Sequence, residues 1–221
     1  MSQRKRVAIL AINAFIAVMV VVAWAMLAFG EGTDKLAERG LGSLKYFTVL
    51  SNFLLGAASL VYAICEVRCL RGNLTEIPRA VHLLKYVATA AVGLTFLTVM
   101  VFLGPLYGYP AMFKGANFWL HLVLPVLAIV EFCMLDGPYE LRSRDNLVAV
   151  APTLIYGIGY ITNILVNGVG EGASSNDWYS FTLWGMDKIP LVLAVMLLVT
   201  FLIGLAIRIA NRRIALRHLA G

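Results

Sequence analysis

Two polar side chains, Thr48 and His121, stand near the starts of long apolar segments and could together perform nucleophilic chemistry. Thr48 lies in segment 46–66 and His121 in segment 119–135. A threonine hydroxyl is a weak nucleophile until a neighbouring base takes its proton, and a histidine with its ordinary pKa of about 6.5 can be that base at neutral pH. Such a pair could attack the carbonyl carbon of an ester. Whether the two side chains can meet depends on the elements that carry them.

The composition is typical of a polytopic membrane protein. Of the 221 residues, 61% are hydrophobic and only 14% are charged, whereas soluble domains carry roughly 25% charged residues. A membrane-spanning helix needs about 20 mostly apolar residues. We therefore expect an all-α bundle of six transmembrane helices that forms one domain over residues 1–221, with spans near 7–29, 46–66, 81–104, 119–135, 146–167 and 190–210.

Basic residues are divided unequally between the two sides of this bundle. Twelve lie at the chain ends and in the loops on the same side, and five lie on the other side (Lys35, Arg39, Lys45, Lys114 and Lys188). Lys85 is expected to snorkel from a span end to the richer side. The positive-inside rule then predicts a multi-pass protein of the cell membrane with both termini cytoplasmic. The net charge of +6 is thus an orientation signal, and we expect membrane lipids as partners and no nucleic acid. The oligomeric state stays open.

This orientation brings the two candidate residues to the same depth. Both segments run from outside to inside, and each residue lies two positions into its span, within roughly 5 Å of the outer boundary. Thr48 and His121 can therefore meet. Each also has an ordinary structural explanation, because a threonine in a helix often bonds the carbonyl four residues back, and a histidine between helices can serve as interhelical contact.

Further polar residues gather at this depth and describe a pocket in the outer half of the bundle. We expect the substrate to contact Ser51, Asn52, Asn117, Asn163 and Trp178. An oxyanion needs a hydrogen-bond donor, and Ser51, Asn52 or Asn163 could supply one.

The histidine has no evident acidic partner at this depth. Glu131 lies ~15 Å further along the same helix. Asp177 or Asp187 from the last outer loop could orient His121, but a Thr–His dyad is the simpler hypothesis. The three cysteines lack histidines at ligand spacing, and we expect neither a metal nor a cofactor.

Two segments carry a resemblance to a known family. The stretch Lys45–Asn52 (KYFTVLSN) resembles the threonine segment of the androgen-induced family of transmembrane hydrolases, which includes the androgen-dependent TFPI-regulating protein and has bacterial members. The stretch 121–125 (HLVLP), preceded by Asn117 and Trp119, resembles its histidine segment. The resemblance implies hydrolysis of fatty acid esters of hydroxy fatty acids, with Thr48 as nucleophile and His121 as general base.

The chain departs from the family in its last outer loop, where related proteins tend to carry a Trp-Tyr-Pro-Phe-like segment. Residues 177–181 read DWYSF, without the proline. We expect this aromatic segment, with Trp178 and Phe181, to cover the site as a lid.

Two alternatives to hydrolysis remain. Acyl transfer would use the same dyad, with an alcohol in place of water. A non-catalytic lipid-binding protein or a small transporter could also use an outward polar pocket. A transporter would more often show charged residues at the midplane, broken helices or internal repeats, and Glu131 is the one deep acidic residue that we expect.

Overall fold

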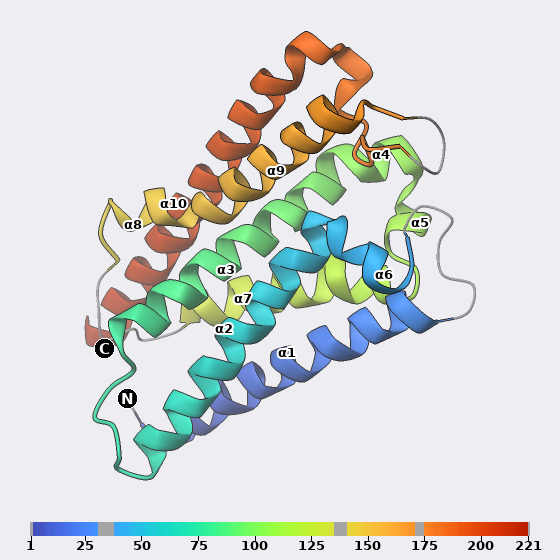
Figure 1. Cartoon of the computed structure of the whole chain (residues 1–221). Helices are drawn as coiled ribbons and strands as arrows, with labels where there is room; N and C mark the ends of the chain where they lie inside the picture. The colour runs from blue at the N-terminus through green and yellow to red at the C-terminus, as the bar shows by residue number, and fades with distance from the viewer. Residues whose placement is uncertain (1, 31–37, 135–140, 171–174, 221) are drawn as a thin grey trace.

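The computed structural model describes residues 2–30, 38–134, 141–170 and 175–220, and every regular element in these ranges is helical (Figure 1). Six helical segments of the described chain are long and apolar enough to cross a membrane. Each overlaps a span expected from the sequence, which confirms the all-α, six-span fold. The segments are Gln3–Phe29, Phe47–Leu70, Arg79–Tyr107, Ala116–Met134, Asp145–Asn167 and Met186–Ile214.

Helix α3 lies at the centre of the bundle and contacts α2, α7 and α10, while α1 packs along α2. The two chain ends lie at the same end of the bundle (Figure 1). Apolar side chains from α1, α2, α3 and α7 fill the space between these helices. The long helices are α1 (Gln3–Phe29), α2 (Phe47–Leu70), α3 (Arg79–Thr98), α7 (Leu124–Met134), α9 (Ala151–Asn167) and α10 (Ile189–Ala220).

Short helical pieces connect these helices at the end opposite to the chain termini (Figure 1). They are η1 (Gly40–Lys45), α4 (Gly104–Tyr107), α5 (Tyr109–Met112), α6 (Ala116–Phe118), η5 (Phe181–Trp184) and η6 (Met186–Lys188). Three of them, α4, α5 and α6, each supply one residue to the wall of the candidate site described below. At the other end, α8 (Asp145–Ala149) leads into α9.

Two π-helical turns interrupt the third and fourth spans, and each ends two residues before a proline. Turn η2 (Val99–Leu103) precedes Pro105, and turn η3 (Trp119–Val123) precedes Pro125. A proline has no N–H to bond the carbonyl four residues earlier, and its ring crowds that carbonyl. The backbone accommodates this by widening one turn, a device that is frequent at functional sites. His121 lies inside η3.

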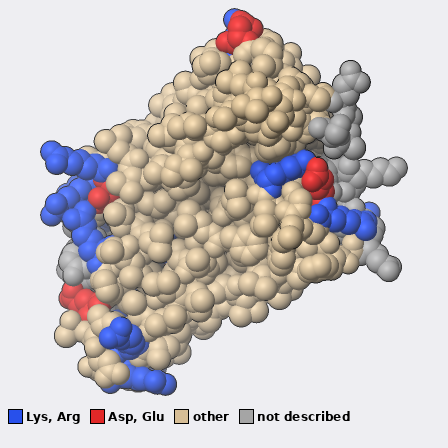
Figure 2. Space-filling model, in the orientation of Figure 1, with Lys and Arg blue, Asp and Glu red and all other residues tan. Residues whose placement is uncertain are grey.

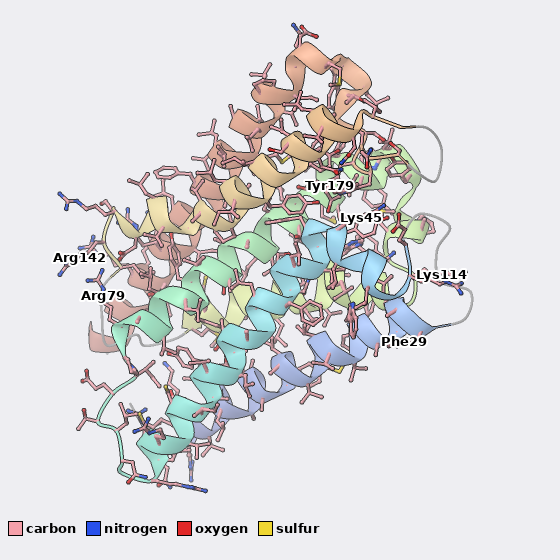
Figure 3. The ribbon with its side chains drawn as sticks, viewed as in Figure 1. Phe29, Lys45, Arg79, Lys114, Arg142 and Tyr179 are labelled. Atoms are coloured by element: carbon pink, nitrogen blue, oxygen red, sulfur yellow. The ribbon has the colours of Figure 1, made fainter. Side chains whose placement is uncertain are left out.

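Charged side chains gather at the two ends of the molecule. Figure 2 shows a broad uncharged band between them, and more of the blue basic groups lie at the end that holds the chain termini. Arg79 and Arg142 mark that end (Figure 3). This distribution is the one expected of a bundle that crosses a bilayer.

Lys85 does not snorkel to the surface, and this expectation from the sequence was wrong. Its ammonium group is fully buried, 2.7 Å from both Asn13 Oδ1 and Ser59 Oγ and 3.1 Å from Glu131 Oε2. The amide of Asn13 also donates to Glu131 Oε1 at 2.7 Å. The side chain turns inward because three other helices offer it two hydrogen-bond acceptors and a carboxylate.

Candidate active site

Thr48 and His121 line the same cavity, which has a volume of about 110 Å³. Thr48 is the second residue of α2, where the chain enters the helix from η1. His121 comes from the π-turn η3 of the fourth span. Asn117 and Trp178, which the sequence also assigns to the site, line this cavity as well. The remaining lining residues described are Leu27, Tyr46, Val49, Leu103, Tyr107, Met112, Leu120 and Tyr179.

The imidazole of His121 is buried and held by the protein backbone. Its Nδ1 atom lies 2.9 Å from the carbonyl oxygen of Met112, the last residue of α5. A carbonyl oxygen only accepts hydrogen bonds, so Nδ1 must carry the proton. In the neutral ring, Nε2 then holds the lone pair that a general base needs.

Asn52 ties the helix that carries Thr48 to the turn that carries His121. Its amide nitrogen donates to the carbonyl oxygen of Thr48 at 2.7 Å and to that of Leu120 at 3.1 Å. Both amide protons are therefore committed to backbone carbonyls. The hypothesis that Asn52 donates to an oxyanion does not fit this arrangement, and Asn52 is better described as a positioning residue.

Ser51 lies beside this tie and faces α3. Its hydroxyl lies 3.0 Å from the hydroxyl of Thr95 and 3.2 Å from the carbonyl oxygen of Thr48. The pair of hydroxyls joins α2 to α3 in the buried interior. Ser51 therefore fixes the start of α2 and does not line the cavity that holds His121.

Asn163 and Trp178 occupy different places. The structure does not bring Asn163 to the cavity, because its amide bonds Asn176 at 3.2 Å and Asn167 bonds its carbonyl oxygen at 2.8 Å. The indole of Trp178 lines the cavity, donates to the Tyr156 hydroxyl at 2.9 Å and has its ring centroid 5.0 Å from the ammonium of Lys45. That the aromatic segment acts as a lid stays a prediction.

Tyr179 is a candidate functional residue that the sequence reasoning did not single out. Its hydroxyl oxygen accepts a hydrogen bond from the backbone N–H of Phe47 at 2.8 Å, at the start of α2 and next to Thr48. Figure 3 shows Tyr179 beside Lys45, just before this helix begins. Burial raises the pKa of the Tyr179 hydroxyl to about 12, although contacts with Tyr156 and with the first amides of α2 oppose the rise. The group stays protonated at neutral pH and can donate a hydrogen bond.

Asp177 organises its own loop. Its carboxylate accepts hydrogen bonds from the hydroxyl of Tyr160, from the backbone N–H groups of Phe181 and Thr182 at 2.8 Å each, and from the Thr182 hydroxyl. Burial disfavours the charged form, but these hydrogen bonds outweigh it and hold the pKa of Asp177 below its ordinary value. Asp187 pairs with the adjacent Lys188 at 2.7 Å. These contacts keep both carboxylates in their loop.

A second, more apolar cavity of about 70 Å³ meets the first one at Thr48. Thr48 and Tyr179 line both cavities. The second cavity lies between α2, α3, α9 and α10, and its wall includes Leu94, Tyr160 and Met196. Thr48 is therefore flanked by a histidine on one side and by an apolar chamber on the other.

Met112 and Tyr179 could not be recognised as partners of the site from residue types alone. The partner atom of Met112 is a backbone carbonyl, which every residue has. Tyr179 does lie within the aromatic segment 177–181, so its position next to Trp178 was the available signal. Comparison with family models, with curated proteins and with solved structures finds no match to this chain.

Proposed function

We propose that this protein is a membrane-embedded ester hydrolase that uses Thr48 as nucleophile and His121 as general base. The observation that carries the proposal is a shared cavity that Thr48 and His121 both line from two different spans. The hydrogen bond of His121 to the Met112 carbonyl supports the role of base, because it leaves the lone pair on Nε2. The resemblance of the two segments to the androgen-induced family of hydrolases points to the same pair.

The reaction would proceed in two halves. The Thr48 oxygen attacks the ester carbonyl carbon while Nε2 of His121 takes its proton. The carbonyl π-electrons move onto oxygen, and the Tyr179 hydroxyl donates a hydrogen bond to this oxyanion. When the intermediate collapses, the bond to the alcohol breaks, and the alcohol leaves with the proton from His121. Water then attacks the acyl carbon while the same histidine takes one of its protons. The bond to the Thr48 oxygen breaks, the histidine returns the proton to that oxygen, and the acyl group leaves as a carboxylic acid. An alcohol in place of water would give acyl transfer.

The substrate class follows from the surroundings of Thr48. The apolar chamber beside it and the lipid-facing helices around it favour ester lipids over water-soluble esters. We place both termini in the cytoplasm, because the termini lie at the end that carries more of the basic side chains. The site then opens near the outer face of the cell membrane, with Trp178 and the aromatic segment as its cover.

One observation favours the alternative of a transporter. Lys85 and Glu131 form a buried charged pair, and such pairs inside membranes often mark ion or proton pathways. Against this reading, the Lys85 ammonium donates hydrogen bonds of 2.7 Å to Asn13 and Ser59 and lies 3.1 Å from Glu131 Oε2 in an ion pair. A satisfied pair of this kind explains the cohesion of α1, α2, α3 and α7 without transport.

Hydrolysis of a short chromogenic ester by the purified protein tests the proposal. Thr48→Ala and His121→Gln should each lower kcat by about 10²-fold or more, since loss of base catalysis alone costs roughly 10²–10⁴-fold. Thr98→Ala is the matched control, because Thr98 lines the apolar cavity with Thr48 but not the cavity with His121. Equal rates for wild type and Thr48→Ala would reject the hydrolase and leave lipid binding or transport.

A further inference from the structure

A long apolar groove runs along the outside of the bundle between α2, α3 and α9. It has a volume of about 600 Å³, within the range of ordinary ligand sites. Figure 2 shows this face hollowed within the uncharged band. The walls are built mainly by aliphatic side chains such as Leu50, Leu54, Leu84, Val87 and Ile155.

The groove is long enough for an extended hydrocarbon chain. Ala80 lines one end, and Ser51, which bonds Thr95, lines the other. The lining residues on α3 run from Ala80 to Val87, ~10 Å at a rise of 1.5 Å per residue, and those on α8 and α9 run from Val148 to Tyr156, ~12 Å. One leaflet of a bilayer contributes roughly 15 Å of hydrocarbon, so these lining stretches correspond to most of the length of one leaflet.

The chemistry of the walls selects the kind of occupant. None of the described residues that line the groove is charged, and the only side-chain polar atoms are the hydroxyls of Ser51 and Tyr156. A peptide or a lipid headgroup would lose its hydration here without gaining hydrogen bonds. A single acyl chain has no polar groups that would need hydrogen bonds inside the groove.

The outer end of the groove meets the candidate active site. Phe47 and Tyr156 line both the groove and the apolar cavity beside Thr48. Their ring centroids are 5.1 Å apart, and the Tyr156 hydroxyl donates to the carbonyl oxygen of Lys45 at 2.7 Å. One pair of rings therefore separates the groove from the chamber that Thr48 faces.

We propose that this groove is the acyl-chain site of the enzyme. The substrate enters sideways from the bilayer, its acyl chain lies along Leu54, Leu84 and Val87 with the chain end toward Ala80, and its carbonyl carbon reaches Thr48 past the Phe47–Tyr156 pair. This inference rests on the proposed hydrolase function and adds a selectivity to it. The enzyme prefers long, unbranched acyl chains, and side chains midway along the groove set the accepted length.

Crosslinking tests the groove without requiring turnover. A palmitic acid with a diazirine at its chain end is photolysed with purified Thr48→Ala protein, and the labelled peptides are mapped by mass spectrometry. A second substitution in the same protein, Ala151→Trp, places a bulky side chain in the groove, because Ala151 is one of the lining residues. Leu60→Trp is the matched control, on an exposed position of α2 outside the groove. We expect label on groove peptides that falls at least about fivefold with Ala151→Trp and not with Leu60→Trp, since each excluded methylene loses binding. Equal labelling of the groove peptides in the Ala151→Trp and Leu60→Trp variants would contradict the assignment of the groove as the acyl-chain site.

The chain-length profile separates this inference from the hydrolase itself. When Thr48 is intact, the single variant Ala151→Trp should lower kcat/KM for a palmitoyl ester by about tenfold or more. Its kcat/KM for a butyryl ester should stay within about twofold of the wild-type value. An equal fall for both esters would contradict a chain-length site. If Thr48→Ala still hydrolyses the butyryl ester, Thr48 is not the nucleophile. The crosslinking result would then still test whether the groove binds the acyl chain.

Discussion

The Nδ1 atom of His121 donates to the carbonyl oxygen of Met112 across 2.9 Å, and this contact fixes which nitrogen of the ring can act as a base. In hydrolytic triads a carboxylate usually holds the histidine in this way. Here a backbone carbonyl from the short helix α5 does so. No side-chain substitution can remove that carbonyl, so the predictions below address the residues around it.

Removal of the Tyr179 hydroxyl should lower kcat more strongly than it lowers the stability of the fold. Tyr179→Phe keeps the ring but removes the donor to the oxyanion, and loss of one such donor typically lowers kcat by about 10²–10³-fold. The lost hydrogen bond from Phe47 should cost only about 0.5–1.5 kcal/mol of stability. Steady-state kinetics and thermal unfolding of the same preparation measure both. A lower melting temperature with unchanged kcat would assign Tyr179 a purely structural role.

Asn52 should be required for the juxtaposition of Thr48 and His121. Asn52→Ala removes the side-chain amide that donates to the carbonyls of Thr48 and Leu120, and we expect a loss of about 1–3 kcal/mol in stability, together with a fall in kcat. Asn163→Ala is the control, because Asn163 is bonded only within the outer end of α9 and its loop. If the two variants hydrolyse esters at the same rate, Asn52 does not position the site.

Acid should weaken the loop that Asp177 organises. Hydrogen bonds hold the pKa of Asp177 below the ordinary 3.8, so its contribution is complete above that value. As the pH falls below 3.8, the unfolded chain takes up a proton first, and the contribution is lost once the pH passes the folded pKa. Thermal unfolding from about pH 5 downward should show this loss in wild type, and Asp177→Asn should lack it. Parallel curves for the two proteins would contradict the assignment.

The buried Lys85–Glu131 pair should stabilise the bundle without serving catalysis. Lys85→Met leaves Glu131 buried and uncompensated, which typically costs about 3–5 kcal/mol. The double variant Lys85→Met/Glu131→Gln should recover part of this loss and keep wild-type kcat. The exposed pair of Lys188 and Asp187 is the control, and Lys188→Met should cost less than about 1 kcal/mol. A folded double variant without hydrolysis would instead give the pair a functional role.

Much of the fold could be predicted because the bilayer imposes it. Six apolar segments of sufficient length leave few alternatives to six helices, and the structure confirms them. Counting charges and residues also predicted a common depth for Thr48 and His121, and both residues line one cavity. Two prolines mark irregular points in the helices. Pro125 follows a π-turn that includes His121, and Pro152 lies just after the junction of α8 and α9.

Other features depend on contacts that no local pattern specifies. Lys85 lies six residues from Arg79, near a helix end, which made snorkelling the reasonable expectation. Its acceptors Asn13, Ser59 and Glu131 come from three separate helices, and only their packing shows that the ammonium can be satisfied inside. The sequence places Asn163 at a depth similar to that of Thr48, but its side chain bonds Asn176 and Asn167. The depth of a residue along a helix does not determine which face of the helix lines the cavity.

Labelling with an activated fluorophosphonate ester tests the central claim most directly, because the reagent traps a nucleophile that a base has activated. We predict that wild-type protein is labelled, that peptide mapping places the label on Thr48, and that labelling disappears in Thr48→Ala and falls sharply in His121→Gln, while the control Thr98→Ala is labelled like wild type. All variants should remain folded by thermal unfolding. Labelling of Thr48→Ala at the wild-type level would contradict the assignment of Thr48 as the nucleophile.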